Sequence, residues 1–243
     1  MAKTVIICGK LFDGLGDTTL GPTEILIEGE TIVEISNSVG RPDGANVLDL
    51  SDRTVSPGFI DTHIHLCVDG LNLARQTLQC SPAKALAGLH YAQQYMRFGF
   101  TTLRDARSLE HCYLIEDEGV AMAEKAGAFL VPTMQMTRED KAHLVAGKLP
   151  EHAVWKFRRD VAVIEDAQRR IARSNAKVAF GTDCGMFPFS EGVLEFQAMV
   201  AAGLAPARAM KAGTSVAAEL YPQLQTCSCT APSDALCQRD KRL

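Results

Sequence analysis

The feature that most constrains the fold is a regular alternation of strand-like and helix-like segments after residue 55. Short apolar runs at 100–105, 128–132 and 177–183 alternate with segments whose apolar residues repeat at helical spacing. The clearest helical stripe, within 151–174, consists of Val154, Phe157, Val161, Ile164 and Ile171. Strands separated by helices are typical of a parallel sheet with helical crossovers, so the sequence predicts an α/β layer or barrel.

The alternation fails at one place, between Ala106 and Arg107. The strand-like run that ends at Ala106 continues directly into a second one, 107–111, with neither a helix nor a turn signal between them. Parallel neighbours need a connection of about a dozen residues or more, so these two segments cannot be adjacent parallel strands. Either they form one long strand, or part of the usual pattern is missing.

Residues 1–55 have a different pattern, with brief β-branched runs at 5–7, 24–27, 32–35 and 47–50. Turn signals separate these runs, which predicts a small antiparallel sheet. We therefore expect three regions: a small β domain over 1–55, an α/β region over 56–219 and an irregular tail over 220–243.

The composition is that of an ordinary globular protein. Of the 243 residues, 47% are hydrophobic and 22% are charged, and the formal net charge is -4. No basic excess indicates nucleic-acid binding, and no apolar run approaches the ~20 residues of a membrane span. The short apolar patch after Met1 does not make a secretory signal, so we expect a cytoplasmic protein that binds neither membranes nor nucleic acid.

The eight cysteines are scattered, which in the cytoplasm indicates reduced thiols rather than a disulfide framework. Three of them, Cys227, Cys229 and Cys237, lie in the last 17 residues. Three thiolates could contribute to a zinc site, but their spacing is unusual for one and no fourth ligand is near. A disordered tail is the preferred interpretation.

His63 and His65 are the first candidates for chemistry. In a strand, side chains two residues apart leave the same face, so the two imidazoles, and Asp61 with them, are expected on one side. Two neutral imidazoles a few ångströms apart are half of a divalent-metal site. The alternative is that the two histidines are polar surface residues of a strand without a ligand. For a bare His-x-His pair this alternative is about as common as a metal site.

Asp183 and His111 each end a predicted strand. Ligands of α/β sheets and barrels lie at the carboxyl ends of the strands, where a carboxylate can bind a metal or accept a proton from water. Each residue also has an ordinary interpretation: Asp183 as the cap of the next turn, and His111 as a partly buried, hydrogen-bonded histidine.

Several motifs together resemble the metal-dependent amidohydrolase superfamily, over about residues 1–220. They are Pro-Gly-Phe-Ile-Asp-Thr-His-Ile-His at 57–65 and Phe-Gly-Thr-Asp at 180–183. Ser-Leu-Glu-His at 108–111, Phe-Leu-Val-Pro-Thr at 129–133 and the stretch 179–220 look like its imidazolonepropionase and Xaa-Pro dipeptidase-like branch.

The resemblance implies a (β/α)8 barrel of the TIM type flanked by a small β-sandwich domain. It further implies one or two divalent metals, usually zinc, and hydrolysis of amide-type C–N bonds in small molecules or dipeptides. His63, His65, His111 and Asp183 match metal ligands of the family, and Asp183 also matches the catalytic acid that shuttles the water proton.

The chain also departs from the family pattern. A bridging lysine on the fourth strand and a histidine on the fifth are missing, and both would fall between Ala106 and Arg107. At about 31 residues per barrel unit, the region 56–219 has room for about five units. We therefore expect an incomplete barrel that lacks the third to fifth units, with the C-terminal sandwich strands replaced by the tail.

Two functions follow as expectations. The first is a metal-dependent amidohydrolase whose substrate, a dipeptide, an imidazolone or another cyclic amide, stays open. The second is a catalytically impaired fragment that acts by association with itself or with a full-length relative, since five strands are not expected to close a barrel.

Overall fold

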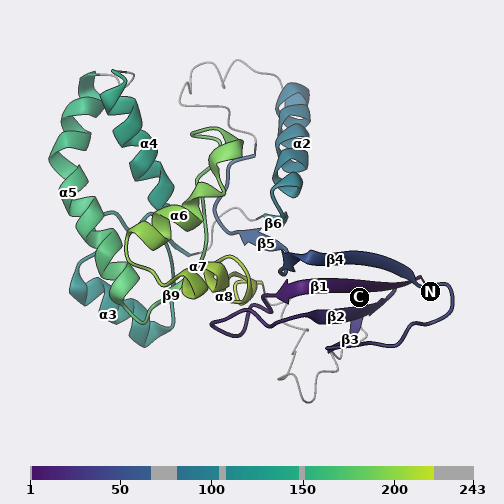
Figure 1. Cartoon of the computed structure of the whole chain (residues 1–243). Helices are drawn as coiled ribbons and strands as arrows, with labels where there is room; N and C mark the ends of the chain where they lie inside the picture. Colours follow the sequence, from purple (N-terminus) through teal and green to yellow (C-terminus); the bar gives the residue numbers. More distant parts are fainter. Residues whose placement is uncertain (1, 67–80, 104–107, 148–150, 222–243) are drawn as a thin grey trace. The chain divides into compact units, whose positions relative to one another are not determined.

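The computed structural model describes residues 2–66, 81–103, 108–147 and 151–221, and these form an α/β protein (Figure 1). The chain divides into two compact units, one containing Met1–Pro57 and the other Gly58–Ala217. The predicted Cys-rich tail lies outside the described residues apart from its first two positions. The described cysteines Cys8, Cys112 and Cys184 are free thiols.

The N-terminal unit contains a four-stranded sheet in the order β3-β2-β1-β4. Its strands are β1 (Lys3–Leu11), β2 (Thr23–Glu28), β3 (Thr31–Ser36) and β4 (Asn46–Val55). Apolar side chains pack on it in two clusters, one around Val5 and Leu26 and the other around Cys8 and Ile25.

The expectation of a purely antiparallel sheet is wrong for one strand. β4 pairs with β1 in parallel, from Thr4 opposite Asn46 onward. The connection 37–45 carries the chain back to the edge where β1 begins, so β4 runs in the same direction as β1. Glu24 fixes this connection by accepting hydrogen bonds from the backbone N–H of Val39 and the guanidinium of Arg41.

The second unit alternates strands and helices. Its strands are β5 (Phe59–Asp61), β6 (Phe100–Leu103), β7 (Leu109–Glu110), β8 (Phe129–Val131) and β9 (Lys177–Val178). Its helices are α2 (Ser81–Arg97), α3 (Asp117–Ala126), α4 (Met134–Val145), α5 (Glu151–Arg173), α6 (Leu194–Ala201), α7 (Pro206–Ala212) and α8 (Ser215–Ala218), with a 3-10 turn at Phe189–Glu191.

All described strand pairs of this unit are parallel: β5 with β6, and β7-β8-β9 in a second ladder. The segment after β9 joins the two ladders, because Phe180 O accepts from Thr62 N and His63 O accepts from Asp183 N. A parallel bridge between Ile64 and Cys184 extends this contact. The strands thus follow one another in the order β6, β5, β9, β8, β7.

A single apolar core supports these strands. The ring of Phe180 contacts the rings of both Phe100 and Phe196. The fully buried side chains of this core include Leu130, Met134, Ile171 and Met199. Figure 1 shows α4 and α5 running side by side as a helical pair. No helix in the described ranges is long and apolar enough to cross a membrane.

Candidate metal centre

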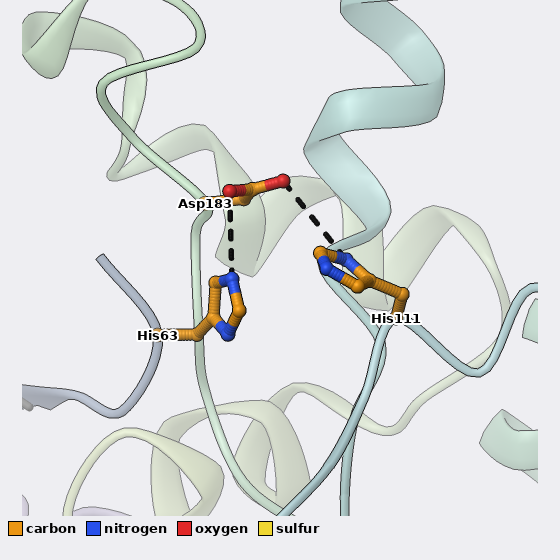
Figure 2. A group of neighbouring side chains, drawn as sticks. All are labelled: His63, His111 and Asp183. Atoms are coloured by element: carbon orange, nitrogen blue, oxygen red, sulfur yellow. Dashed lines mark ion pairs between the residues drawn. The ribbon is translucent and has the colours of Figure 1, made fainter. Parts of the chain in front are cut away.

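The carboxyl ends of three parallel strands bring the predicted site residues together. His63 and His65 follow β5, His111 follows β7, and Asp183 follows β9 by five residues. Asp183 Oδ1 lies 3.4 Å from His63 Nε2 and 3.2 Å from His65 Nε2, and Asp183 Oδ2 lies 3.9 Å from His111 Nδ1. Figure 2 shows His63 and His111 turned toward the carboxylate of Asp183.

The two histidines of the His-x-His motif do not lie on a regular strand, as the alternation argument assumed. Strand β5 ends at Asp61, and the backbone bends before His63. The imidazoles nevertheless meet, with ring centroids 5.2 Å apart, because both contact the same carboxylate oxygen.

Asp61 is buried in the structure and serves as a brace between two segments. Its Oδ1 accepts hydrogen bonds from the backbone N–H groups of His63 and Thr182, and its Oδ2 accepts from the Thr182 hydroxyl. Burial raises the pKa of Asp61 to about 7, although these hydrogen bonds oppose the shift. Asp61 thereby ties the end of β5 to the segment that carries Asp183.

Gly181 allows these two segments to approach closely. A Cβ atom at this position would lie 2.3 Å from Val131 Cγ1 and 2.7 Å from His63 Cβ. Only glycine fits at such distances, so Gly181 permits the spacing between His63 and Asp183.

Glu110 is a member of the site that the sequence analysis missed. Its Oε2 lies 2.9 Å from His63 Nδ1, and its Oε1 accepts a hydrogen bond from the Ser108 hydroxyl. A carboxylate at Nδ1 favours the tautomer with the proton on Nδ1, which leaves the lone pair of Nε2 free. Nε2 of His63 is buried and has no hydrogen-bond partner.

A divalent cation fits this arrangement. His63, His111 and Asp183 each offer a ligand atom, and these atoms all lie within 4.8 Å of one another. The buried Nε2 of His63 has no hydrogen-bond partner, since Asp183 Oδ1 lies 3.4 Å away, and a metal ion would satisfy it. The carboxylate-imidazole pair of Glu110 and His63 is the outer-shell arrangement typical of metal-binding histidines.

The electrostatics of the buried His63 and the partly exposed His111 differ. Burial lowers the pKa of His63, but the neighbouring carboxylates Asp183 and Glu110 outweigh it and raise the pKa to about 9. Burial lowers the pKa of His111 below its ordinary value, which favours its neutral form. The two carboxylates therefore favour a positive charge at His63, either a proton or a cation that replaces it at Nε2, while His111 stays neutral.

Backbone strain is concentrated at the same place. Among the described residues, the non-glycine positions with positive φ are His111, Cys112, Thr133 and Asp183. This conformation costs free energy for residues with a Cβ, and such residues cluster at functional sites. Thr133, whose hydroxyl oxygen lies 3.0 Å from His111 Nδ1, ends the motif at 129–133 but was not predicted as a site residue.

No family model matches the chain. The chain is 40% identical to a dihydroorotase of Clostridium acetobutylicum over 68 residues, 28% of this chain and 16% of that protein. It is 38% identical to a dihydroorotase of Mycobacterium leprae over 85 residues, 35% of this chain and 19% of that protein. The matches thus span less than a fifth of these curated relatives.

Solved structures match over nearly the whole chain. A Xaa-Pro dipeptidase with bound methionine has a TM-score of 0.79 at 18% identity, with 92% of this chain and 89% of that chain covered. A prolidase in complex with N-methylphosphonate-L-proline has a TM-score of 0.80 at 17% identity, covering 90% and 87%. At such low identity the likeness shows a common fold. The chain is thus similar in fold to an Xaa-Pro dipeptidase and a prolidase, and similar in short stretches of sequence to dihydroorotases.

Proposed function

We propose that this chain is a metal-dependent hydrolase of amide-type C–N bonds in small molecules or dipeptides. The observation that carries the proposal is the buried Nε2 of His63, which has no hydrogen-bond partner, together with Glu110 at Nδ1 of the same ring and the neighbouring Asp183 and His111. His63, His65, His111 and Asp183 would hold one or two divalent ions, and zinc suits this mixture of imidazole and carboxylate.

The residues around the proposed metal site would have different roles in the hydrolysis. A divalent ion held there supplies Lewis-acid chemistry, which polarises the scissile carbonyl and makes a water more acidic. Asp183 accepts the proton of the attacking water at a carboxylate oxygen and passes it to the leaving nitrogen. Glu110 keeps the His63 ring in place, and the Asp61–Thr182 brace keeps Asp183 facing it.

The choice of substrates to test follows from the relatives. The sequence relatives are named dihydroorotases, after a cyclic substrate with a C–N bond. Two structural neighbours are named an Xaa-Pro dipeptidase and a prolidase. Xaa-Pro dipeptides, dihydroorotate and imidazolone-type cyclic amides therefore form the first panel. We expect turnover only in the presence of added divalent metal.

Metal content tests the proposal most directly. The purified chain, reconstituted with zinc and desalted, is expected to retain about one equivalent by elemental analysis, and His63→Ala is expected to lose it. His90→Ala is the matched control, because His90 lies exposed on α2 and bonds only Gln94 among the described contacts. Wild-type protein that retains no metal would refute the proposal.

We propose as the second candidate that the barrel is incomplete and that the chain associates with a second copy or with a full-length relative. In the described residues, β6 pairs only with β5, and β7 pairs only with β8. Five residues separate β6 from β7 along the chain, which is too few for a parallel crossover, so the chain cannot join these two edges itself. Open edges of this kind are templates for pairing with another chain.

A further inference from the structure

Helix α4 begins in an unusual way. Its N-cap residue, Thr133, has φ +45° and ψ +53°, and its side chain makes no capping hydrogen bond. Threonine at an N-cap normally accepts a bond from the second or third backbone N–H of the helix, in an extended conformation. The first N–H groups of α4 must therefore be satisfied by another residue.

That residue is Glu195, from helix α6. Its Oε1 accepts a hydrogen bond from Met134 N at 2.9 Å, and its Oε2 accepts from Gln135 N at 2.5 Å. Glu195 is fully buried. A buried carboxylate is costly unless it is hydrogen-bonded, and here both oxygens meet donors at the positive end of a helix.

The hydroxyl of Thr133 is consequently free for other contacts. Its Oγ1 lies 3.0 Å from His111 Nδ1 and 3.3 Å from the hydroxyl of Tyr113. Thr133 is itself fully buried, and its left-handed backbone is unfavourable for a β-branched residue. Surrounding contacts must hold it there, and the two bonds from Glu195 act on the residues directly after it.

From this we infer that Glu195 is a positioning residue of the metal centre. By capping α4 in place of Thr133, it holds Thr133 in the conformation in which its hydroxyl fixes the ring of His111. The link to metal binding rests on the proposed function, whereas the orientation of His111 can be measured without metal.

The test reads the imidazole nitrogens of His111 by long-range 1H–15N NMR in metal-free protein. Glu195→Gln keeps the shape of the side chain but replaces one acceptor oxygen with a donor. We expect it to shift the His111 resonances as Thr133→Val does, and the double variant to shift them no further, since both act through one hydroxyl. Glu124→Gln is the control, because Glu124 also accepts a backbone N–H, that of Asn175, but lies away from the site.

A purely structural Glu195 gives a different result. In that case Glu195→Gln lowers the unfolding midpoint while the His111 resonances stay at their wild-type positions, and the inference is overturned. If Glu195→Gln does not fold, the pair Thr133→Val and Thr133→Ser decides. The serine variant retains the hydroxyl and is expected to keep the wild-type resonances, and unchanged resonances in Thr133→Val also overturn the inference.

Zinc affinity separates this inference from the proposed function. If the metal centre is correct, Glu195→Gln and Thr133→Val weaken zinc binding about 10- to 100-fold, the usual effect of removing an outer-shell partner, and Thr133→Ser does not. If wild-type protein binds no zinc, the proposed function fails, while the NMR result still decides the role of Glu195.

Discussion

At the scale of single residues, the candidate metal site includes side chains that the spacing of residues in the sequence does not predict. Four site residues were predicted from their places after strands. Three of them, His63, His65 and His111, lie around the carboxylate of the fourth, Asp183. Glu110 and Thr133 were not predicted, because a left-handed backbone at His111 and Thr133 decides which side chains face inward. Neither histidine nor threonine is a residue type whose presence in a sequence predicts a left-handed backbone.

Glu110→Gln tests the role of the carboxylate at Nδ1 of His63. The amide retains the size of the side chain but no longer favours the proton on Nδ1, so Nε2 becomes a weaker ligand. We expect zinc affinity to fall about 10- to 100-fold in a competition titration with a chromophoric chelator. Glu118→Gln, at an exposed acid of α3, serves as the control. Equal zinc affinity in the Glu110 variant would contradict the role assigned here.

Glu24 predicts a pH dependence of stability for the N-terminal sheet. Hydrogen bonds from Arg41 and from Val39 N lower its pKa from 4.5 to about 2. Because the folded pKa is depressed, the stabilisation is complete above about pH 4.5 and is lost as the pH falls toward 2. The difference in unfolding midpoint between wild type and Glu24→Gln should therefore shrink between pH 5 and 2.

A matched variant supports the same measurement. Glu28 pairs with Lys3 at 2.9 Å, but both side chains are more than a third exposed, so solvent screens this pair. Glu28→Gln is expected to change the midpoint little at any pH in this range. A Glu24→Gln difference that stays constant from pH 5 to 2 would exclude the effect.

At the scale of elements, hydrophobic periodicity predicted those helices whose bounds depend on the local sequence. Helix α5 was predicted to within one residue of its observed bounds, because an apolar stripe at helical spacing defines it. Helix α4 was missed, since its residues are polar and its cap, Glu195, lies about 60 residues further along the chain. The strand β9 is shorter than predicted, because the chain after Val178 bonds to the segment following β5.

Gly181→Ala tests the close contact between the segments after β5 and β9. The added Cβ would lie within 2.7 Å of atoms of both Val131 and His63, so the segments must separate. We expect a loss of about 1–3 kcal/mol in unfolding free energy by urea titration, together with weaker zinc binding. Gly40→Ala is the control, because a Cβ there would meet nothing within 4 Å. A variant with wild-type stability and zinc affinity would show that the contact does not position His63.

At the scale of the whole molecule, the order β6, β5, β9, β8, β7 leaves β6 and β7 each with one paired neighbour among the described residues. The break in alternation at Ala106 and Arg107 predicted that β6 and β7 would not be neighbours, and they are not paired within the described residues. Exposed apolar side chains lie on elements that adjoin these strands in the sequence. They are Leu86, Leu89 and Met96 on α2, Leu109 in β7, Leu114 after it and Met122 on α3.

These edges lead to a prediction about assembly. If they pair with another copy, the mass measured by light scattering after size exclusion should exceed the 26.3 kDa of one chain and rise with concentration. The double variant Leu86→Lys with Leu89→Lys places two charges on the α2 surface and should shift the population toward monomer. Val145→Lys is the control, because Val145 is 89% exposed at the end of α4, on a different helix. The opposite result is a wild-type monomer at all concentrations with a cooperative thermal melt. It would show that the five strands are stable without a partner, and it would favour the first proposal, a hydrolase that acts as a monomer.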